Sequence, residues 1–340
     1  MELIFFSIFI ILIYPINILI KKSNFLPSQT GERHQNFLGK KNVPLSGGLY
    51  ILIFITFLTY ENFYLSFSFI IFYFLGLSSD KMYISSPTKR FILQMIFIIL
   101  FVNYFDLKIL DLRNDYFSSL LNNKIVSIIF VVLCFLVLIN GSNFIDGLNG
   151  LQVGYYLIII CILFKNNFLY FVGLDNVYSI LLIILLSYLL ILNFKNKLFL
   201  GDSGSYILSL LLGYFLINIY NYNNNISPFF IALLLWYPCF ENLFSILRKF
   251  NINKSPLKPD NKHMHQIIYL YLKTKYKLNK NSANNFSSLL INSFNLLIIY
   301  LGSLKYNHSL IQLSLITAFS LIYVYFYIRI IKKIPKKAIN

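Results

Sequence analysis

A series of long apolar stretches, separated by short polar segments, is the feature that most constrains how this chain can fold. Each stretch approaches the roughly 20 residues that a helix needs to cross about 30 Å of hydrocarbon. Lipid offers no partner for backbone amides, and the stretches are continuous rather than alternating, so helices are expected and barrel strands are not. We therefore expect an all-α polytopic membrane protein with about 11 transmembrane helices in a single membrane-embedded domain, 1–340. The stretches cover residues 2–20, 46–60, 63–78, 91–105, 125–140, 151–165, 178–193, 204–220, 228–247, 287–304 and 308–331.

The distribution of basic residues predicts the orientation of these helices. If the N-terminus lies outside, 24 of the 29 Lys and Arg residues fall on the inner side and five on the outer side. Loops that stay in the cytoplasm carry such an excess of positive charge. The sequence therefore predicts an outer N-terminus and a cytoplasmic C-terminus. The cytoplasmic loops would lie at about 21–45, 79–90, 141–150, 194–203 and 248–286.

Composition argues against three other interpretations. The first stretch lacks a basic leader and a small-residue cleavage site, so we interpret it as a retained span rather than a signal peptide. The net charge of +17 is explained by topology and anionic lipid, and nucleic acid is not an expected partner. The three cysteines, Cys134, Cys161 and Cys239, lie in or at the edge of apolar stretches without C-x-x-C spacing, so neither disulfides nor a zinc site are expected.

The positions of the acidic residues are more informative than their number. Asp80, Asp146 and Asp202 lie at the predicted mouths of helices, where an unpaired carboxylate in lipid would be costly. Each one alone could reach water or pair with a neighbouring lysine. Three together, each within a polar turn, favour a shared cationic partner. The predicted inner side also holds Glu32, Asp260 and Glu241, the last near the inner end of the ninth stretch.

Two turns suggest what that partner is. In "FLGDSGSYILSLLLG", 199–213, small residues permit a tight turn into a helix whose first amides favour anions. Asp202 would repel such an anion unless a cation lay between them. Together with Asn143, Asp146 or Asn149 of "NGSNFIDGLNG", 140–150, it could supply the hard oxygen ligands of Mg²⁺, which implies a diphosphate substrate. The alternative is that Asp202 and Ser203 only cap the helix.

Three further polar stretches fall on the same predicted side. In "SPLKPDNKHMHQ", 255–266, His263 and His265 make a poor zinc site and are better suited, with Lys258 and Lys262, to hydrogen bonding with phosphate oxygens. In "LSSDKMYISSPTKRFILQ", 77–94, Asp80 is followed nine residues later by Lys89. In "ERHQNFLGKKNVPLSGG", 32–48, Pro44 and the Gly47, Gly48 pair mark a turn into the second stretch.

These five stretches, in this order, resemble the polyprenyl-phosphate N-acetylhexosamine-1-phosphate transferase family, and in particular its branch that initiates O-antigen and teichoic-acid synthesis. The motifs "NFIDGLNGL", "FLGDSGS" and "SPxxPDxxHxH" carry the resemblance, which spans nearly the whole chain. It implies transfer of N-acetylhexosamine 1-phosphate from a UDP-sugar to undecaprenyl or another polyprenyl phosphate, with release of UMP, at the cytoplasmic face of a bacterial plasma membrane. The implied partners are these two substrates and membrane lipid, with a homodimer as one candidate assembly.

The resemblance also implies roles for individual residues. Asn143 and Asp202 would hold Mg²⁺, with Mn²⁺ as the alternative ion, and Asp202, Asp80 and Lys89 would form the catalytic set. Glu241 lies where relatives often have Asp and keeps the charge. The implied substrate-binding residues are Asp146 near the uracil, Phe199 stacked on it, Asn149, and His263 and His265 on phosphate groups.

Three departures from the family pattern bear on activity. Ser79 replaces the first carboxylate of an aspartate pair that otherwise ends the third span, Asn149 replaces a later aspartate, and Gln266 a third histidine. The missing carboxylate has been considered a base for the acceptor phosphate. A phosphate monoester has a second pKa of about 6, so the acceptor is largely dianionic without a base. We therefore expect an active enzyme in which Asp80 orients the acceptor, the shell of the metal or Lys89.

Two other functional classes remain as alternatives. A transporter or flippase would also suit eleven spans, but such proteins usually carry ionisable groups near the bilayer midplane, and Glu241 alone lies within a predicted span. An inactive relative that binds nucleotide or lipid is made conceivable by Ser79.

Overall fold

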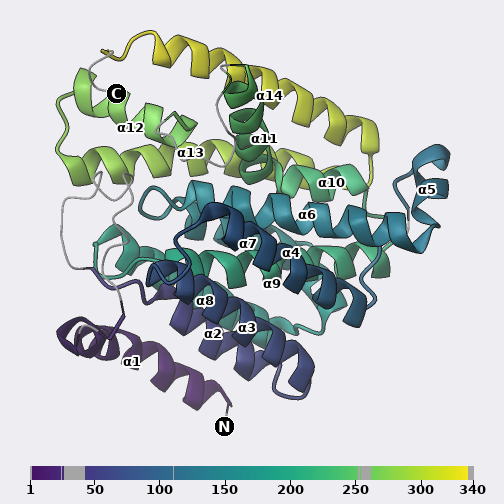
Figure 1. Cartoon of the computed structure of the whole chain (residues 1–340), viewed down its shortest axis with the longest axis horizontal. Helices are drawn as coiled ribbons and strands as arrows, with labels where there is room; N and C mark the ends of the chain where they lie inside the picture. Colours follow the sequence, from purple (N-terminus) through teal and green to yellow (C-terminus); the bar gives the residue numbers. More distant parts are fainter. Residues whose placement is uncertain are drawn as a thin grey trace.

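A computed structural model describes residues 2–23, 25–26, 43–109, 111–251, 253 and 262–335, and the side chains from Phe6 onward within these ranges. These residues form fourteen α-helices and one short 3₁₀ helix, η2, without a strand (Figure 1). Glu32, Asp260 and Lys258 lie outside the described residues. The elements are α1 (Glu2–Ser23), α2 (Gly47–Leu58), α3 (Phe63–Asp80), α4 (Pro87–Tyr104), α5 (Asp115–Leu121), α6 (Lys124–Ile145), α7 (Leu151–Lys165), η2 (Phe168–Val172), α8 (Asn176–Phe194), α9 (Gly201–Tyr222), α10 (Pro228–Leu234), α11 (Trp236–Phe250), α12 (Met264–Lys275), α13 (Lys280–Ser303) and α14 (Ser309–Ile331).

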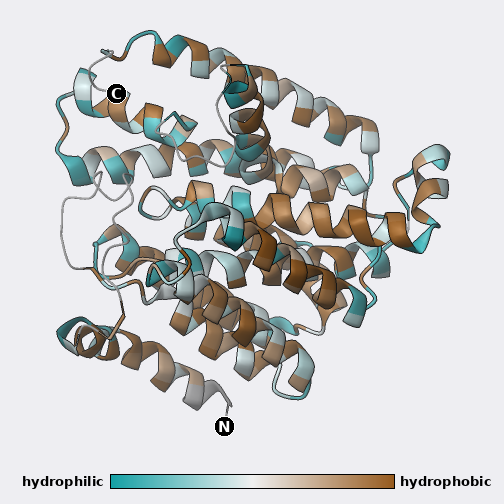
Figure 2. Cartoon of the chain, viewed as in Figure 1, coloured by the Kyte–Doolittle hydropathy of each residue, from teal (hydrophilic) through white to brown (hydrophobic). Residues whose placement is uncertain are grey.

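Every one of the eleven predicted stretches is helical, which confirms the all-α polytopic fold. Among the described residues, seven helices are long and apolar enough to cross a membrane, and an eighth span results if α10 and α11 are taken together. Helices α2 and α7 are shorter but apolar. Figure 2 shows the apolar residues running along the helices, whereas polar residues gather at helix ends and loops. The chain is therefore a multi-span membrane protein.

Several helices begin earlier than the apolar pattern predicts. Helix α4 begins at Pro87, α9 at Gly201 and α13 at Lys280, each several residues before its apolar stretch. The added first turns contain polar residues such as Lys89 and Asp202, which hydropathy assigns to loops. The polar residues of the candidate site are for this reason held on helix ends rather than on free loops.

Helix α9 is the central helix of the bundle, since 83% of its most apolar window is buried. It packs most closely against α3, because Gly76 has no side chain: a Cβ atom there would overlap the backbone of Ser203. A Cβ on Gly48 of α2 would in the same way lie 2.5 Å from the backbone nitrogen of Gly204. These close approaches bring the ends of α2 and α3 against the first turn of α9.

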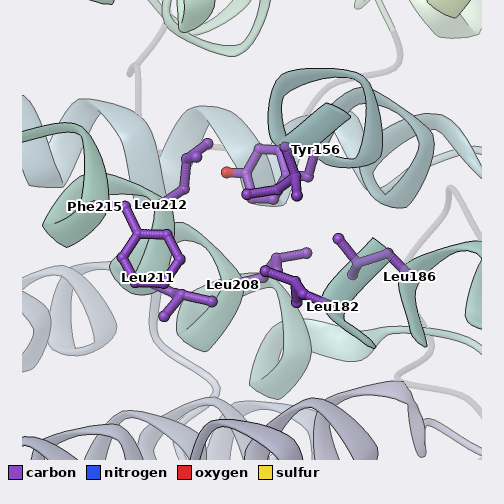
Figure 3. Close-up of a pocket in the computed structure, with 8 residues that line it drawn as sticks. Tyr156, Leu182, Leu186, Leu208, Leu211, Leu212 and Phe215 are labelled. Atoms are coloured by element: carbon purple, nitrogen blue, oxygen red, sulfur yellow. The ribbon is translucent and has the colours of Figure 1, made fainter. Parts of the chain in front are cut away.

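Farther along α9, apolar side chains complete the core. Figure 3 shows a small void between α7, α8 and α9 whose lining is apolar except for one hydroxyl. That hydroxyl belongs to Tyr156 and is hydrogen-bonded to Ser209 at 3.0 Å. The void therefore offers no free polar group to a ligand. Its lining residues are Tyr156, Ile160, Leu182, Leu186, Leu208, Leu211, Leu212 and Phe215.

The ninth predicted span is broken rather than straight. Helices α10 and α11 meet at Leu235 with a bend of 76°. Pro238 explains the break, since its ring cannot donate a backbone hydrogen bond and would clash with the carbonyl of Leu234 in a continuous helix. Beyond the bend, the indole of Trp236 donates a hydrogen bond to Ser320 of α14 at 3.0 Å. The bend thus directs α11 away from the axis of α10 and across α14, where Phe240 and Phe244 contact Tyr323 and Tyr327 (Figure 1).

Alternate loops gather at opposite ends of the bundle, as the predicted topology requires. At one end, the guanidinium of Arg113 donates to the backbone carbonyls of Asn224, Asn225, Ile226 and Asn307. All of these residues belong to predicted outer loops. The predicted inner loops meet at the other end, where they form the candidate site. The assignment of that end to the cytoplasm stays a prediction from the basic residues.

Candidate functional site

The site is built around the first turn of α9. Phe199 donates its amide hydrogen to the carbonyl of Pro44 at 3.0 Å, and its own carbonyl accepts from Gly47 at 2.9 Å. Gly201 follows with a φ of 75°, a left-handed conformation that favours glycine. The turn before α9 is thereby fixed to the turn before α2. The half-buried side chain of Phe199 therefore projects from a backbone held on both sides.

Asp80, at the end of α3, caps the N-terminus of α9, although the two residues it contacts lie more than 120 positions later in the chain. Its Oδ1 accepts from the backbone N–H of Asp202 at 2.8 Å, and its Oδ2 from that of Ser203 at 3.1 Å. The carboxylate is buried and opposes the positive end of the helix dipole. The first amides of α9 do favour an anion, as the sequence predicts, and the anion that they bind is the Asp80 carboxylate. Asp80 thereby fixes the backbone that carries Asp202.

The side chain of Asp202 faces a serine and an arginine. Its Oδ2 accepts a hydrogen bond from the Ser79 hydroxyl and lies 3.0 Å from Nη1 of Arg90. The same Arg90 nitrogen donates to the Ser79 oxygen at 2.7 Å. The alternative that Asp202 and Ser203 only cap α9 is wrong, since the N-cap residue is Leu200 and no side-chain cap is formed. Ser79 therefore replaces a carboxylate with a hydroxyl that donates to Asp202.

Lys89, the predicted phosphate ligand, is exposed in the first turn of α4, whereas its neighbour Arg90 reaches the site. Consecutive residues of a helix point about 100° apart, so only one of the two can face α9. The phase follows from the start of α4, where Ser86 caps the helix and Pro87 begins it. Sequence reasoning missed Arg90 because hydropathy does not locate that start.

Asp146 follows the last residue of α6 and lies beside the same turn. Burial and the nearby carboxylates of Asp202 and Asp80 raise its pKa well above the ordinary aspartate value, and a hydrogen bond from the Gly201 amide opposes that rise. Asn143 lies one helical turn earlier, on the same side of α6. Both side chains are half-buried. The structure thus brings the "NFIDG" and "FLGDS" motifs together.

The chemistry of these side chains fits a magnesium ion that is shared with a substrate. Asp80, Asp146 and Asp202 bring three carboxyl groups together beside the single guanidinium of Arg90. Burial and mutual repulsion raise the pKa of Asp146, and a bound cation would relieve that repulsion. Among the described residues, no group of three or more His, Cys, Asp or Glu side chains is arranged to hold a metal alone. Zinc sites need such a group, whereas Mg²⁺ is usually held by one or two carboxylates plus phosphate oxygens.

Asn149 has a different environment from the other predicted substrate ligands. It is buried, its amide group donates to Asn196 at 2.9 Å and to Asn285 at 3.2 Å, and its backbone N–H donates to Asn284 at 2.8 Å. The next carbonyl, that of Gly150, accepts from Asn292 at 3.0 Å. These contacts join the turn after α6 to the turn before α9 and to α13. They give Asn149 a structural role.

The two predicted histidines lie against the "NFIDG" motif. His265 is fully buried, and a Cβ atom on Gly147 would lie 2.7 Å from its Nε2. The ring of His263 stacks with that of His265 at 5.6 Å between centroids and packs on Phe144 at 5.2 Å. Only a glycine at 147 leaves room for this arrangement. The structure therefore brings His263 and His265 to the same end of the bundle as Asp146.

Comparisons with known proteins agree with this arrangement of motifs. Residues 62–220, which contain α3 to α8 and nearly all of α9, match the family described as glycosyl transferase family 4. Decaprenyl-phosphate N-acetylglucosaminephosphotransferase of Mycolicibacterium smegmatis is 29% identical over 170 residues, which cover 44% of this chain and 42% of the relative. Probable undecaprenyl-phosphate N-acetylglucosaminyl 1-phosphate transferase of Bacillus subtilis is 29% identical over 214 residues, covering 58% and 55%.

A third relative has a different named activity. Phospho-N-acetylmuramoyl-pentapeptide-transferase of Dictyoglomus turgidum is 29% identical over 181 residues, which cover 50% of this chain and 57% of the relative. In all three comparisons, the match spans about half the length of the relative. The matched region contains the Asp80, Asp146 and Asp202 turns. Residues 62–220 of the chain are thus similar to glycosyl transferase family 4.

Proposed function

We propose that this protein transfers N-acetylhexosamine 1-phosphate from a UDP-sugar to a polyprenyl phosphate in the plasma membrane of a bacterium, as the first step of a cell-surface glycan. The observation that carries the proposal is the convergence of Asp80, Asp146 and Asp202 with Arg90 at one end of a membrane bundle. The names of two of the relatives above contain decaprenyl phosphate or undecaprenyl phosphate, which supports the same chemistry.

The reaction needs positioning and charge neutralisation more than a base. A non-bridging oxygen of the polyprenyl phosphate attacks the sugar-proximal phosphorus, a new P–O bond forms, and the bond from that phosphorus to the bridging oxygen breaks to release UMP. The acceptor is already largely dianionic, because its second pKa is about 6. The two phosphates repel each other, so the protein must hold them together against that repulsion.

Side chains of the site divide these tasks. Asn143 and Asp202 would hold Mg²⁺, which when bound neutralises charge on the diphosphate and polarises its phosphorus. Asp80 keeps Asp202 in place through the backbone of α9, and Ser79 and Arg90 orient the Asp202 carboxylate. His263 and His265, which pack beside Phe144 and Gly147, would donate hydrogen bonds to phosphate oxygens.

The membrane setting agrees with an isoprenoid substrate. Beyond the bend, α11 exposes Leu243, Leu247 and Phe250, while its other face is buried. In a lipid bilayer such a surface can lie along an isoprenoid tail, and the tail's phosphate then reaches the polar end of the bundle. The excess of basic residues at this end supports a cytoplasmic site, where UDP-sugars are made available.

Release of UMP by purified protein tests the proposal. Wild-type protein in lipid nanodiscs is expected to release UMP from UDP-GlcNAc or another UDP-N-acetylhexosamine only when undecaprenyl phosphate and Mg²⁺ are both present. Omission of the lipid and a Asp202→Ala variant are the controls. A transporter or an inactive relative would release none from any member of a UDP-sugar panel, and that result would exclude the proposed activity.

A further inference from the structure

Glu241 is a buried carboxylate whose two oxygens are both engaged. Oε1 lies 3.0 Å from Nδ1 of His263 and accepts from the backbone N–H of Met264 at 3.0 Å. Oε2 accepts from the hydroxyl of Tyr323 at 2.8 Å. Only 1% of the residue is exposed. A buried carboxylate is costly unless it is paired and hydrogen-bonded, and here the Met264 amide donates to one oxygen and the Tyr323 hydroxyl to the other, which favours the ionised form.

These contacts connect three helices at one point. Glu241 lies on α11 just beyond the bend, His263 and Met264 begin α12, and Tyr323 lies on α14. The carboxylate takes up the first amide of α12, where the helix dipole favours an anion. The side chain of Gln266 also accepts from the His263 amide at 3.3 Å, in a capping box. The start of α12, and with it the backbone of His263, is thereby fixed to α11.

The contact with Glu241 also determines which nitrogen of His263 carries a proton. An ionised carboxylate can only accept, so Nδ1 must be protonated and donate to it. Nε2 then donates to a phosphate only when the ring is doubly protonated, and in that state Glu241 balances the charge of the imidazolium. The ring plane is set in addition by stacking with His265 and by packing against Phe144.

We propose that Glu241 is a positioning residue of the transferase that acts through His263 and does not itself touch the substrate. This inference rests on the proposed function, because it assigns His263 to a substrate phosphate. Glu241 fixes the tautomer and the orientation of the His263 ring against the "NFIDG" motif, and it supplies the negative charge that a cationic His263 requires.

The pairing can be measured without any transfer activity. The chain has four histidines, so ¹⁵N-histidine NMR of the full-length protein in micelles can assign His263 by the loss of its signals in His263→Ala. Wild-type protein is expected to show Nδ1 of His263 protonated and hydrogen-bonded. Glu241→Ala should shift both ring nitrogens of His263, whereas Ser320→Ala, which removes a different contact between α11 and α14, should leave them unchanged.

Kinetics then test the consequence of the pairing. Carboxylates that orient a functional histidine typically contribute about 10- to 100-fold to activity, so Glu241→Ala should lower kcat by that factor with a smaller change in KM for the UDP-sugar. Glu241→Gln retains an acceptor for Nδ1 and should lose less. The double variant Glu241→Ala, His263→Ala should be no slower than His263→Ala alone, since Glu241 acts through that ring.

The outcomes separate this inference from the proposed function. The inference would be overturned if the factors by which the two single variants lower kcat multiply in the double variant. It would also be overturned if Glu241→Ala shifts the His263 nitrogen signals but keeps full transfer, or if it leaves those signals unshifted. If Glu241→Ala unfolds, Glu241→Gln, which keeps the shape of the side chain and removes its charge, provides the comparison, with a smaller expected shift and a smaller expected loss of kcat. A wild-type protein that shows the pairing but releases no UMP would refute the proposed function, and the positioning role with it. An active wild type in which the effects of Glu241→Ala and His263→Ala on kcat are independent would refute the positioning role alone.

Discussion

Arg90 and Asp202 form an ion pair across the candidate site, with Nη1 and Oδ2 3.0 Å apart and both groups hydrogen-bonded to the Ser79 hydroxyl. The pair joins the start of α4 to the start of α9, which are more than one hundred residues apart. About a fifth of each side chain is exposed, so the pair is accessible to ligands. A cation that approaches Asp202 therefore meets a carboxylate already oriented by two donors.

Replacing Asp202 by alanine is expected to lower transfer by about 100-fold or more, because the loss removes a charge that stabilises the reacting diphosphate. Asp202→Asn, which keeps the shape and one acceptor oxygen, should lose nearly as much. Measurement of UMP release at increasing Mg²⁺ concentration distinguishes a metal ligand from a structural residue. Undiminished transfer by Asp202→Ala would contradict the assignment of the metal.

Arg90 and Lys89 are adjacent but should respond differently to replacement. Arg90→Ala removes a charge-assisted hydrogen bond to Asp202 and should lower kcat by about 10- to 100-fold, with Arg90→Lys in between. Lys89→Ala alters an exposed side chain and should change kcat by no more than about twofold. Equal losses in both variants would show that α4 presents Lys89 to the substrate as well, as the sequence alone predicts.

Restoring a carboxylate at residue 79 should make the protein depend more strongly on divalent cations. In Ser79→Asp, an acceptor would replace the hydroxyl that now donates to Asp202, and the two carboxylates would repel each other. The unfolding temperature in EDTA should therefore fall, and the increase on adding Mg²⁺ should exceed that of the wild type. Ser79→Ala, which removes the hydroxyl without adding charge, is the control. An equal Mg²⁺ effect in all three proteins would contradict a cation at this position.

Asp146 should make the metal-free protein less stable as pH rises. Its pKa is raised by burial and by Asp202 and Asp80, so the folded chain retains a proton that the unfolded chain releases above about pH 4. The free energy of unfolding then falls between that pH and the raised pKa, since the folded state binds more protons. A divalent cation displaces the proton, so its affinity should increase with pH.

Thermal unfolding in EDTA and Mg²⁺ titrations, both followed from about pH 5 to pH 8, measure this effect. Asp146→Asn should remove that part of the pH dependence and raise the unfolding temperature at the upper end of the range. A wild type whose stability in EDTA rises with pH over the same interval, to the same extent as Asp146→Asn, would contradict the raised pKa.

Gly76 is expected to be required for the close contact between α3 and α9. A Cβ atom there would overlap the backbone of Ser203, which cannot move without displacing Asp202, so Gly76→Ala should lower stability by about 1–3 kcal/mol and reduce transfer. Gly173→Ala is the matched control: no atom lies within 4 Å of its Cβ position, so only its left-handed φ adds strain. Thermal unfolding and UMP release of both variants check the prediction, and a Gly76→Ala protein with normal transfer would contradict it.

The helices could be predicted from the sequence because the length and hydropathy of one apolar stretch are enough to indicate a membrane-spanning helix, whatever the rest of the chain does. All eleven stretches are helical. Because each span carries the chain to the other end of the bundle, the order of the spans also predicts which loops lie together. The break between α10 and α11 could have been expected at Pro238, since proline interrupts the hydrogen bonds of the preceding turn. A purely hydropathic pattern does not register this, because both halves are apolar.

The contacts within the site were predicted less completely, because they join residues that are distant in the sequence. The meeting of Asp80 with the amides of α9, and that of Glu241 with His263, depend on how helices pack, which no local pattern contains. Arg90 was missed for a local reason, the unknown phase of α4. The roles of the predicted site residues in catalysis stay predictions that the variants above test.

Arg113 bears on how the molecule can move. Its guanidinium donates hydrogen bonds to backbone carbonyls of two other loops and so connects three loops at the end of the bundle opposite the site. A transporter that moves a substrate across the bilayer must open each end of the bundle in turn, and would have to break such contacts. An enzyme whose substrates bind and whose products leave at one leaflet can keep the opposite end of the bundle closed throughout its cycle. The hydrogen bonds of Arg113 agree with such an enzyme.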